Sequence, residues 1–279
     1  MRDKSRMMGI RDEPVAGNRS IRFEDGDAYE RTMSPWSLLA GDPFIDWLAT
    51  PGGLRWLDVG CGTGAFTELV LQRCAPVETQ GIDPQEEQLA VARARLGARG
   101  AAFLRGDAMA LPFGRHRFDA AVMGLVIFFV TDPARGVAEM ARVVRPGGLV
   151  AAYAWDLLGG GFPFDPIWEE IRAAGFKPVL PPNAHAGELD ALCDLWTGAG
   201  LEAVQTRQIM VERIFSTFED YWATSTSTIT GSVRPALDAM TADERVRLKA
   251  RVSARLPADS MGCVTHRARA NAVKGRVPI

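Results

Sequence analysis

The sequence predicts an α/β protein built on a doubly wound, mostly parallel sheet, and three observations lead to this fold class. Five short apolar segments have the length and composition of buried strands: residues 54–59, 77–83, 101–107, 118–126 and 149–155. Segments with the apolar spacing of helices follow the first, second and fourth of them. A glycine-rich turn joins the first strand directly to a helix. Strands and helices that alternate in this way form a parallel sheet with helices on both faces.

The glycine-rich turn has the sequence Asp58-Val59-Gly60-Cys61-Gly62-Thr63-Gly64. Glycine lacks a Cβ atom, so it tolerates a positive φ angle and lets a ligand lie close to the backbone. The helix that follows offers free N–H groups and the positive end of its dipole, which suit an anionic group. Gly60, Gly62 and Ala65 also satisfy the dinucleotide-binding pattern G-x-G-x-x-G/A, so the turn alone does not identify its ligand.

Patterns along the rest of the chain predict further helices and strands. Residues 1–20 are rich in charge and have no apolar period, so we expect a disordered tail. A helix is expected at 27–39, broken at Pro35, and a second at 43–48. Asp132 and Pro133 form an N-cap and a first-turn proline. Helices are expected at 65–74, 85–96, 166–174 and 188–199, strands at 201–213 and 263–273, and helix starts at two capping boxes, 216–219 and 241–244.

Composition narrows the class of protein. The 279 residues are 47% apolar and 24% charged with a net charge of −2, which gives one substantial core and no general attraction to nucleic acid. The longest apolar run, residues 120–130, is too short to span a bilayer, which takes about 20 residues. Four scattered cysteines and a charged N-terminus without an apolar signal region favour a cytoplasmic protein. The three histidines show no metal-ligand spacing, so no metal is expected.

Three details narrow the choice of ligand for the glycine-rich turn. Asp58 stands two residues before Gly60, Gly64 adds a third glycine, and a second acidic strand end follows at Asp107. Together they resemble the class I S-adenosylmethionine-dependent methyltransferases, whose first motif is an acidic residue followed by G-x-G-x-G. The resemblance spans about residues 23–213 and is closest to the group with the ubiquinone/menaquinone-biosynthesis C-methyltransferases and many small-molecule methyltransferases.

The resemblance implies a Rossmann-like fold and a domain layout. The last two strands should form an antiparallel pair at the sheet edge. Residues 21–279 should form one domain, with helical lid elements at about 21–50, 157–187 and 215–258.

The resemblance also implies S-adenosyl-L-methionine as the cofactor. Asp83 is placed to accept hydrogen bonds from the ribose hydroxyls, with a helix N-cap as its alternative role. Asp107 resembles the adenine contact, with a loop cap as its alternative, and Asp58 suits the ammonium group. The predicted cofactor-binding residues are Asp58, Gly60, Cys61, Gly62, Gly64, Asp83, Pro84, Gln88, Asp107, Ala108, Gly124 and Leu125.

The methyl acceptor is less defined by the sequence. A sulfonium methyl group is already electrophilic, so the protein chiefly aligns the nucleophile, and a base is needed only if the acceptor must lose a proton. No catalytic base stands out, and the candidates are His185, Asp156 and Tyr29. Candidates for the substrate pocket, each also compatible with core packing, are Tyr29, Met33, Trp36, Trp155, Tyr221 and Trp222.

The sequence therefore predicts an enzyme that moves a methyl group from S-adenosylmethionine to a small, apolar or aromatic acceptor. Two alternatives remain at this point. One is a nicotinamide-dependent oxidoreductase, for which no convincing catalytic arrangement is found. The other is a non-catalytic protein that binds S-adenosylmethionine, which the missing base keeps open.

Overall fold

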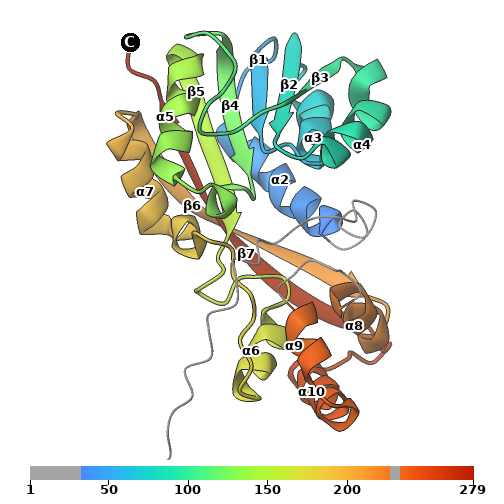
Figure 1. The fold of residues 1–279 in the computed structure, drawn as a ribbon. Coiled ribbons are helices and arrows are strands. Elements are labelled where there is room, and N and C mark those ends of the chain that lie inside the picture. The colour runs from blue at the N-terminus through green and yellow to red at the C-terminus, as the bar shows by residue number, and fades with distance from the viewer. Residues whose placement is uncertain (1–32, 227–232) are drawn as a thin grey trace, which may run out of the picture.

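The computed structural model describes residues 33–226 and 233–279. In this part of the chain, seven strands form one sheet in the order β3-β2-β1-β4-β5-β7-β6 (Figure 1). Strands β1 to β5 are parallel, and β7 is antiparallel to both of its neighbours, β5 and β6. The predicted Rossmann-like sheet and its antiparallel C-terminal pair are confirmed.

The strands follow the predicted apolar segments, with the largest differences after residue 143. The two antiparallel strands are longer than predicted, and β5 begins five residues earlier because residues 144–148 continue the strand. The bounds are β1 (Arg55–Val59), β2 (Glu78–Asp83), β3 (Ala101–Arg105), β4 (Phe118–Gly124), β5 (Val144–Trp155), β6 (Glu202–Phe215) and β7 (Val264–Arg276).

Helices cover both faces of the sheet. On one face α2 (Ser34–Leu48) packs against α3 (Ala65–Arg73), with α4 (Glu86–Leu96) beside β3. On the other face lie α5 (Pro133–Val143) and α7 (Leu189–Gly198). The N-cap of α5 is Asp132, whose carboxylate accepts the Arg135 N–H at 3.1 Å, as the sequence predicts.

Two predicted helix boundaries are wrong. The helices expected at 27–39 and 43–48 are one helix from residue 34 onward, because Pro35 lies in its first turn, where no N–H bond is required. Pro43 lies inside that helix without ending it. The helix α8 (Phe218–Thr226) is capped by Thr217, whose hydroxyl accepts the Asp220 N–H at 3.1 Å, rather than by Ser216. Residues 27–32 and the predicted tail lie outside the described residues.

Beyond the carboxyl ends of the parallel strands, β6 and β7 continue into a group of helices that we call the distal region (Figure 1). It consists of α6 (Asp165–Ala173), α8, α9 (Arg234–Ala239) and α10 (Ala242–Arg255). Glu170 of α6 accepts Arg251 at 2.7 Å and Arg255 at 2.5 Å, which ties α6 to α10. The predicted capping box at Thr241 and Glu244 begins α10.

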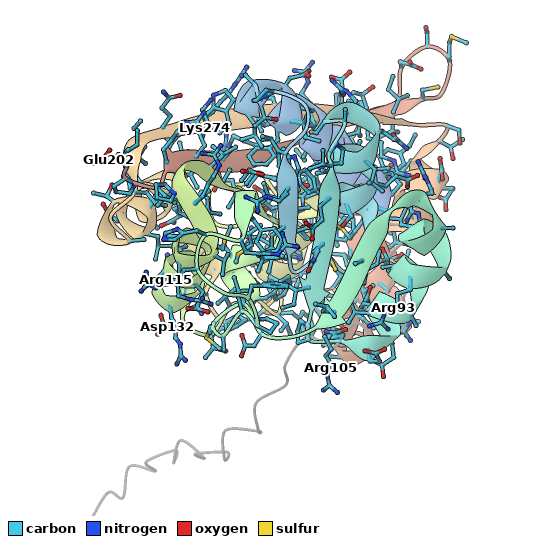
Figure 2. The ribbon with its side chains drawn as sticks, turned by 90° about the horizontal axis from the view of Figure 1, so that it is seen from above. Arg93, Arg105, Arg115, Asp132, Glu202 and Lys274 are labelled. Atoms are coloured by element: carbon cyan, nitrogen blue, oxygen red, sulfur yellow. The ribbon has the colours of Figure 1, made fainter. Side chains whose placement is uncertain are left out.

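Charged side chains of both signs surround the molecule. Arg93 and Arg105 lie at the β3 edge, whereas Glu202 and Lys274 lie at the β6 edge (Figure 2). Within the described ranges, no helix combines the length and apolar character needed to cross a membrane.

Candidate active site

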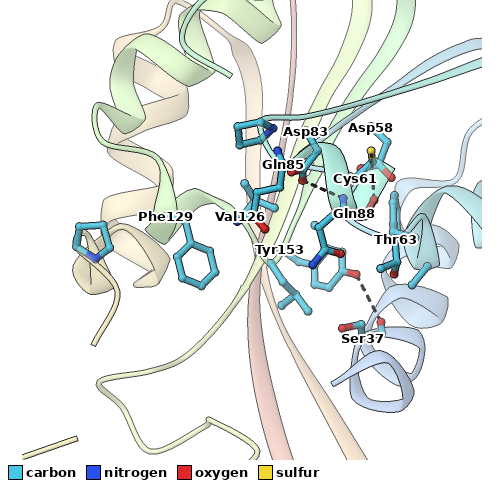
Figure 3. Close-up of a pocket in the computed structure, with 18 of the residues that line it drawn as sticks. Ser37, Asp58, Cys61, Thr63, Asp83, Gln85, Gln88, Val126, Phe129 and Tyr153 are labelled. Carbon is cyan, nitrogen blue, oxygen red and sulfur yellow. Dashed lines mark hydrogen bonds between the residues drawn. The ribbon is translucent and has the colours of Figure 1, made fainter. Parts of the chain in front are cut away.

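A pocket of about 520 Å³ lies at the carboxyl ends of β1, β2 and β4 (Figure 3). This is the side of an open α/β sheet on which ligands bind. Nine of the twelve predicted cofactor-binding residues line it: Asp58, Gly60, Cys61, Gly62, Asp83, Pro84, Gln88, Gly124 and Leu125. The structure thus brings most of the predicted set together.

The glycine turn forms the floor of the pocket. The N–H groups of Gly60 and Cys61 both donate to the Ile82 carbonyl, at 2.7 and 3.0 Å, which fixes the turn to the end of β2. Gly60 has a φ of +77°, and a Cβ atom there would lie 2.5 Å from Val126. A Cβ on Gly62 would meet only Gln88, at 3.8 Å. Gly60 is therefore required by packing, whereas the Gly62 backbone is open on its pocket side.

Asp58 is buried beneath this turn. Its exposed fraction is 2%, and its carboxylate accepts the Thr67 hydroxyl at 2.6 Å. Burial raises the pKa of Asp58 to about 7, and the nearby charge of Asp83 adds to the increase. Among the described residues, no cation contributes to this pKa. A buried acid in this state is favourable for a ligand that brings a positive group.

Asp83 lies at the end of β2 and holds the same turn from the other side. One carboxylate oxygen accepts the Gly62 N–H at 3.0 Å and the other accepts the Gln85 N–H at 2.9 Å. Burial raises the pKa of Asp83, and the two backbone N–H groups oppose this. Asp83 therefore fills its alternative role as a cap, because it accepts a hydrogen bond from the chain ahead of α4. Its side chain also lines the pocket. Ribose binding stays a prediction.

The opposite wall is apolar and comes from two segments far apart in sequence. Phe129 and Val126 follow β4, and Leu180 and Pro182 come from the loop before α7. Asn183 joins the two segments, because its side-chain amide donates to the Val130 carbonyl at 2.6 Å and to the Thr131 carbonyl at 3.2 Å. The pocket therefore has an acidic side at the glycine turn and an apolar side across from it.

Three predicted cofactor residues do not line this pocket. A Cβ on Gly64 would approach Leu96 at 2.8 Å, so this glycine permits close packing of α4. Asp107 is exposed after β3, and its carboxylate accepts the Met109 N–H at 2.8 Å, which is the capping alternative. Ala108 follows it. Contact of Asp107 and Ala108 with adenine stays a prediction.

The candidates for a catalytic base lie away from the pocket or outside the described residues. His185 has a side chain that is 83% exposed, and its Nδ1 lies 3.5 Å from Glu188. Asp156 is buried and accepts Arg269 Nε at 2.9 Å and Nη2 at 2.5 Å, so it is held in an ion pair. Tyr29 lies outside the described residues. The described part of the chain thus offers none of these as a base in the pocket.

Three of the six predicted substrate residues, Trp36, Trp155 and Tyr221, lie in one group of rings and do not line this pocket. We call Trp36, Trp155, Phe215, Tyr221 and His266 the aromatic cluster. The Trp36 ring lies 6.5 Å from Trp155, 6.3 Å from Phe215 and 5.7 Å from His266, and His266 lies 5.8 Å from Tyr221.

The last two substrate candidates have different surroundings. Met33 is buried in the core at the start of α2. Trp222 lies on the outer side of α8, in a surface cleft with Arg245 and Lys249. Neither residue lines the pocket at the glycine turn.

Sequence reasoning missed part of the pocket. Tyr153 and Ser37 line the pocket, and neither was predicted to do so, although the strand and the helix that carry them were predicted. A two-residue alternation along β5 could have found Tyr153, because Tyr153 and Trp155 lie on the same face. The other missed lining residues are Thr63, Ala65, Phe66, Gln85, Val126, Phe129, Thr131, Leu180 and Pro182.

Comparison with known proteins agrees with this geometry. Residues 57–152 match a family model described as a methyltransferase domain. A demethylmenaquinone methyltransferase of Staphylococcus aureus is 34% identical over 131 residues, which are 46% of this chain and 52% of that protein. The chain contains a class I S-adenosylmethionine-dependent methyltransferase domain. It spans about half the length of the curated relatives it matches.

Solved structures share the fold of this methyltransferase domain. The YcgJ protein of Bacillus subtilis has a TM-score of 0.57 at 16% identity, covering 88% of this chain and 99% of that one. Phosphoethanolamine N-methyltransferase 2 of Haemonchus contortus, solved with S-adenosyl-L-methionine, has a TM-score of 0.55 at 16% identity, covering 91% of this chain and 57% of that one. At such identities the likeness shows the fold alone.

The residues of the pocket fit S-adenosylmethionine on observations from this structure. The Gly62 backbone is open on the pocket side, and the buried Gln88 Oε1 beside it has no partner among the described residues. The Asp58 carboxyl group is buried, and no cation of the described residues contributes to its pKa. These are the surroundings that a zwitterionic amino acid and a hydroxylated sugar would complete. Within the described ranges, no cluster of His, Cys, Asp and Glu is suited to a metal ion.

Proposed function

We propose that this protein is an enzyme that transfers a methyl group from S-adenosylmethionine to a small, apolar or aromatic acceptor. The observation that carries the proposal is the two-sided pocket. Asp58 and Asp83 stand on the side of the glycine turn, which suits the polar parts of the cofactor. Phe129 and Leu180 stand on the other side, which suits an apolar acceptor.

In this proposal the protein acts mainly by alignment. The cofactor supplies an electrophilic methyl group on a sulfonium. Asp83 holds the turn in place through Gly62 and would bind the ribose, and Asp58 would pair with the ammonium group. Leu125, with a φ of +61° and its N–H bonded to the Tyr153 carbonyl at 2.7 Å, brings the backbone after β4 to the pocket. Fixing two reactants in line supplies a large part of the acceleration in such reactions.

The proposal includes no general base among the pocket residues. Both carboxyl groups of the pocket already accept hydrogen bonds from the chain that they organise. We also propose that the protein is cytoplasmic, because all four cysteines lie in the described residues and are free thiols.

Calorimetry and a turnover screen test this function. We expect the protein to bind S-adenosylhomocysteine and not NADH, and to methylate at least one member of a panel of quinols, phenols, amines and thiols. Binding of NADH in place of S-adenosylhomocysteine would favour the oxidoreductase. Tight binding of S-adenosylhomocysteine without turnover of any acceptor would favour a non-catalytic binding protein.

A further inference from the structure

One residue of the candidate pocket has a strained backbone. In the described part of the chain, five residues other than glycine have a positive φ: Ala49, Ala75, His116, Leu125 and Ala203. The Cβ atom makes this conformation unfavourable for every residue except glycine. Four of the five are exposed, whereas Leu125 is only 6% exposed and lines the pocket. Such strain persists only where the surroundings hold it, and it gathers at functional sites.

The contacts on both sides of Leu125 hold it in this conformation. Its N–H donates to the Tyr153 carbonyl on β5 at 2.7 Å. Before it, Gly124 lies against the Tyr153 ring, because a Cβ atom on Gly124 would be 3.0 Å from that ring. After it, Val126 packs on the glycine turn, where a Cβ atom on Gly60 would be 2.5 Å from Val126. Leu125 therefore turns the chain from β5 toward the glycine turn.

The chain that follows carries part of the apolar side of the pocket, and we call residues 126–129 the wall segment. Val126 and Phe129 both line the pocket (Figure 3). The Phe129 N–H donates to the Val126 carbonyl at 2.7 Å. The Phe128 carbonyl accepts the Asn183 N–H at 3.0 Å, which ties the segment to the loop on the same wall. Because the segment is bonded in this way, the direction in which the chain enters it sets where the Phe129 ring lies.

We propose that Leu125 is a positioning residue for methyl transfer. Its left-handed backbone fixes the wall segment relative to the glycine turn, so that an acceptor on the apolar side lies in line with the cofactor. Alignment of this kind can supply a large part of the acceleration, and small displacements are costly. The Leu125 side chain has no polar atom, so it takes no part in proton transfer. This inference rests on the proposed function and adds the residue that sets the alignment.

Three variants separate the backbone of Leu125 from its side chain. Leu125→Ile keeps the volume but adds a branch at Cβ, which disfavours the left-handed conformation further. Leu125→Met also keeps the volume and has no such branch. Ala203→Val is the matched control, because Ala203 has a φ of +50°, is exposed and does not line the pocket. Leu125→Ile and Ala203→Val should each lower the Tm by about 2–4 °C.

Hydrogen exchange of the wall segment and calorimetry with S-adenosylhomocysteine are the readouts, both on the full chain. We expect S-adenosylhomocysteine to slow exchange in the wild type, because Val126 packs on the turn that binds it. In Leu125→Ile the segment should exchange about three- to tenfold faster, and affinity for S-adenosylhomocysteine should fall about three- to tenfold. Leu125→Met should lose at most about twofold in either measurement, and Ala203→Val should change neither.

Kinetics with an acceptor from the turnover screen distinguish alignment from binding. In Leu125→Ile, kcat should fall about ten- to 100-fold, and this loss should exceed the rise in KM for the acceptor, because misalignment acts on the transition state. Ala203→Val should leave both constants as in the wild type.

Equal exchange and equal affinity for S-adenosylhomocysteine in Leu125→Ile and Leu125→Met would overturn the inference, as would the same changes in Ala203→Val. A wild type that does not bind S-adenosylhomocysteine would instead overturn the proposed function. Exchange of the wall segment in the free variants would still show whether Leu125 fixes it, so the two failures are distinguishable.

Discussion

The glycine turn and the aromatic cluster differ in how their side chains are held. At the glycine turn, Asp58 accepts the Thr67 hydroxyl and Asp83 accepts the backbone N–H groups of Gly62 and Gln85. In the aromatic cluster, the contacts are mainly between rings, and His266 Nε2 has no hydrogen-bond partner among the described residues. The turn is organised by hydrogen bonds within the chain, whereas the cluster is held by the packing of buried rings.

This difference predicts two kinds of response to mutation. Changes at the turn should lower stability and cofactor affinity together, because the same bonds serve both. Truncations in the cluster should lower stability with little effect on cofactor affinity, because its rings are buried and none of them lines the pocket.

The largest effect should come from Gly60→Ala. Gly53 and Gly60 have nearly equal φ angles, +78° and +77°, but a Cβ at Gly53 meets nothing within 4 Å, whereas one at Gly60 would lie 2.5 Å from Val126. We expect Gly53→Ala to cost about 1 kcal/mol from its backbone alone and Gly60→Ala about 2–4 kcal/mol. Denaturant unfolding measures both. Equal losses would show that packing against Val126 does not define the turn.

The next effect concerns Asp83. Asp83→Ala removes the acceptor of two backbone N–H groups and the proposed ribose contact, so affinity for S-adenosylhomocysteine should fall about 30- to 100-fold. Asp119→Ala is a control, because Asp119 is another strand carboxylate, paired with Arg55 at 3.0 Å, and does not line the pocket. Calorimetry that finds the same affinity for wild type and Asp83→Ala would remove Asp83 from the cofactor site.

Asp58 should make cofactor binding depend on pH. Its pKa is raised to about 7 by burial, so it is largely protonated at pH 6, and a positive ammonium group binds the deprotonated form better. Affinity for S-adenosylhomocysteine should therefore rise by up to about fivefold between pH 6 and 7, by up to about tenfold between pH 6 and 8, and level off above pH 8. Asp58→Asn should bind more weakly and lose this slope.

The stability of the free protein should change with pH in the direction opposite to cofactor affinity. The folded-state pKa of Asp58 lies above its unfolded value of 3.8, so the native state holds the extra proton between about pH 4 and 7. Its contribution to the stability of the free protein should fall as pH rises through this window. Thermal unfolding of wild type and Asp58→Asn across the window measures this, and parallel curves would contradict the assignment.

The same comparison explains what the sequence could predict. Asp58, the turn and Asp83 follow one another within a strand-turn-helix-strand unit, so local patterns place them at one edge of the sheet. Trp36, Trp155, Tyr221 and His266 come from four distant segments, and only tertiary packing decides that they meet. The sequence pointed to three of them as substrate residues but not to His266, whose position in an alternating strand carries no such signal. Asp107 shows the reverse, since β3 ends at Arg105, two residues earlier than predicted, and the Asp107 side chain does not line the pocket.

The smallest effect should come from the apolar wall across the pocket from the glycine turn. The side-chain amide of Asn183 donates to two carbonyls after β4. Its backbone N–H also donates to the Phe128 carbonyl, at 3.0 Å. Asn183→Asp keeps the shape but replaces the donor with an acceptor that faces those carbonyls. We expect a loss of about 1 kcal/mol in stability and a two- to fivefold weaker binding of 1-naphthol, a phenol that probes the apolar side of the pocket, since Leu180 and Pro182 would be held less firmly on the wall they share with Phe129.

Affinity for S-adenosylhomocysteine should change less than affinity for 1-naphthol in Asn183→Asp, because the glycine turn has its own bonds. Lys177→Ala, on an exposed side chain of the same loop, is the matched control and should alter neither. If Asn183→Asp instead weakens S-adenosylhomocysteine as strongly as 1-naphthol, the apolar wall belongs to the cofactor. The acidic side and the apolar side of the pocket would then form one binding surface for the cofactor.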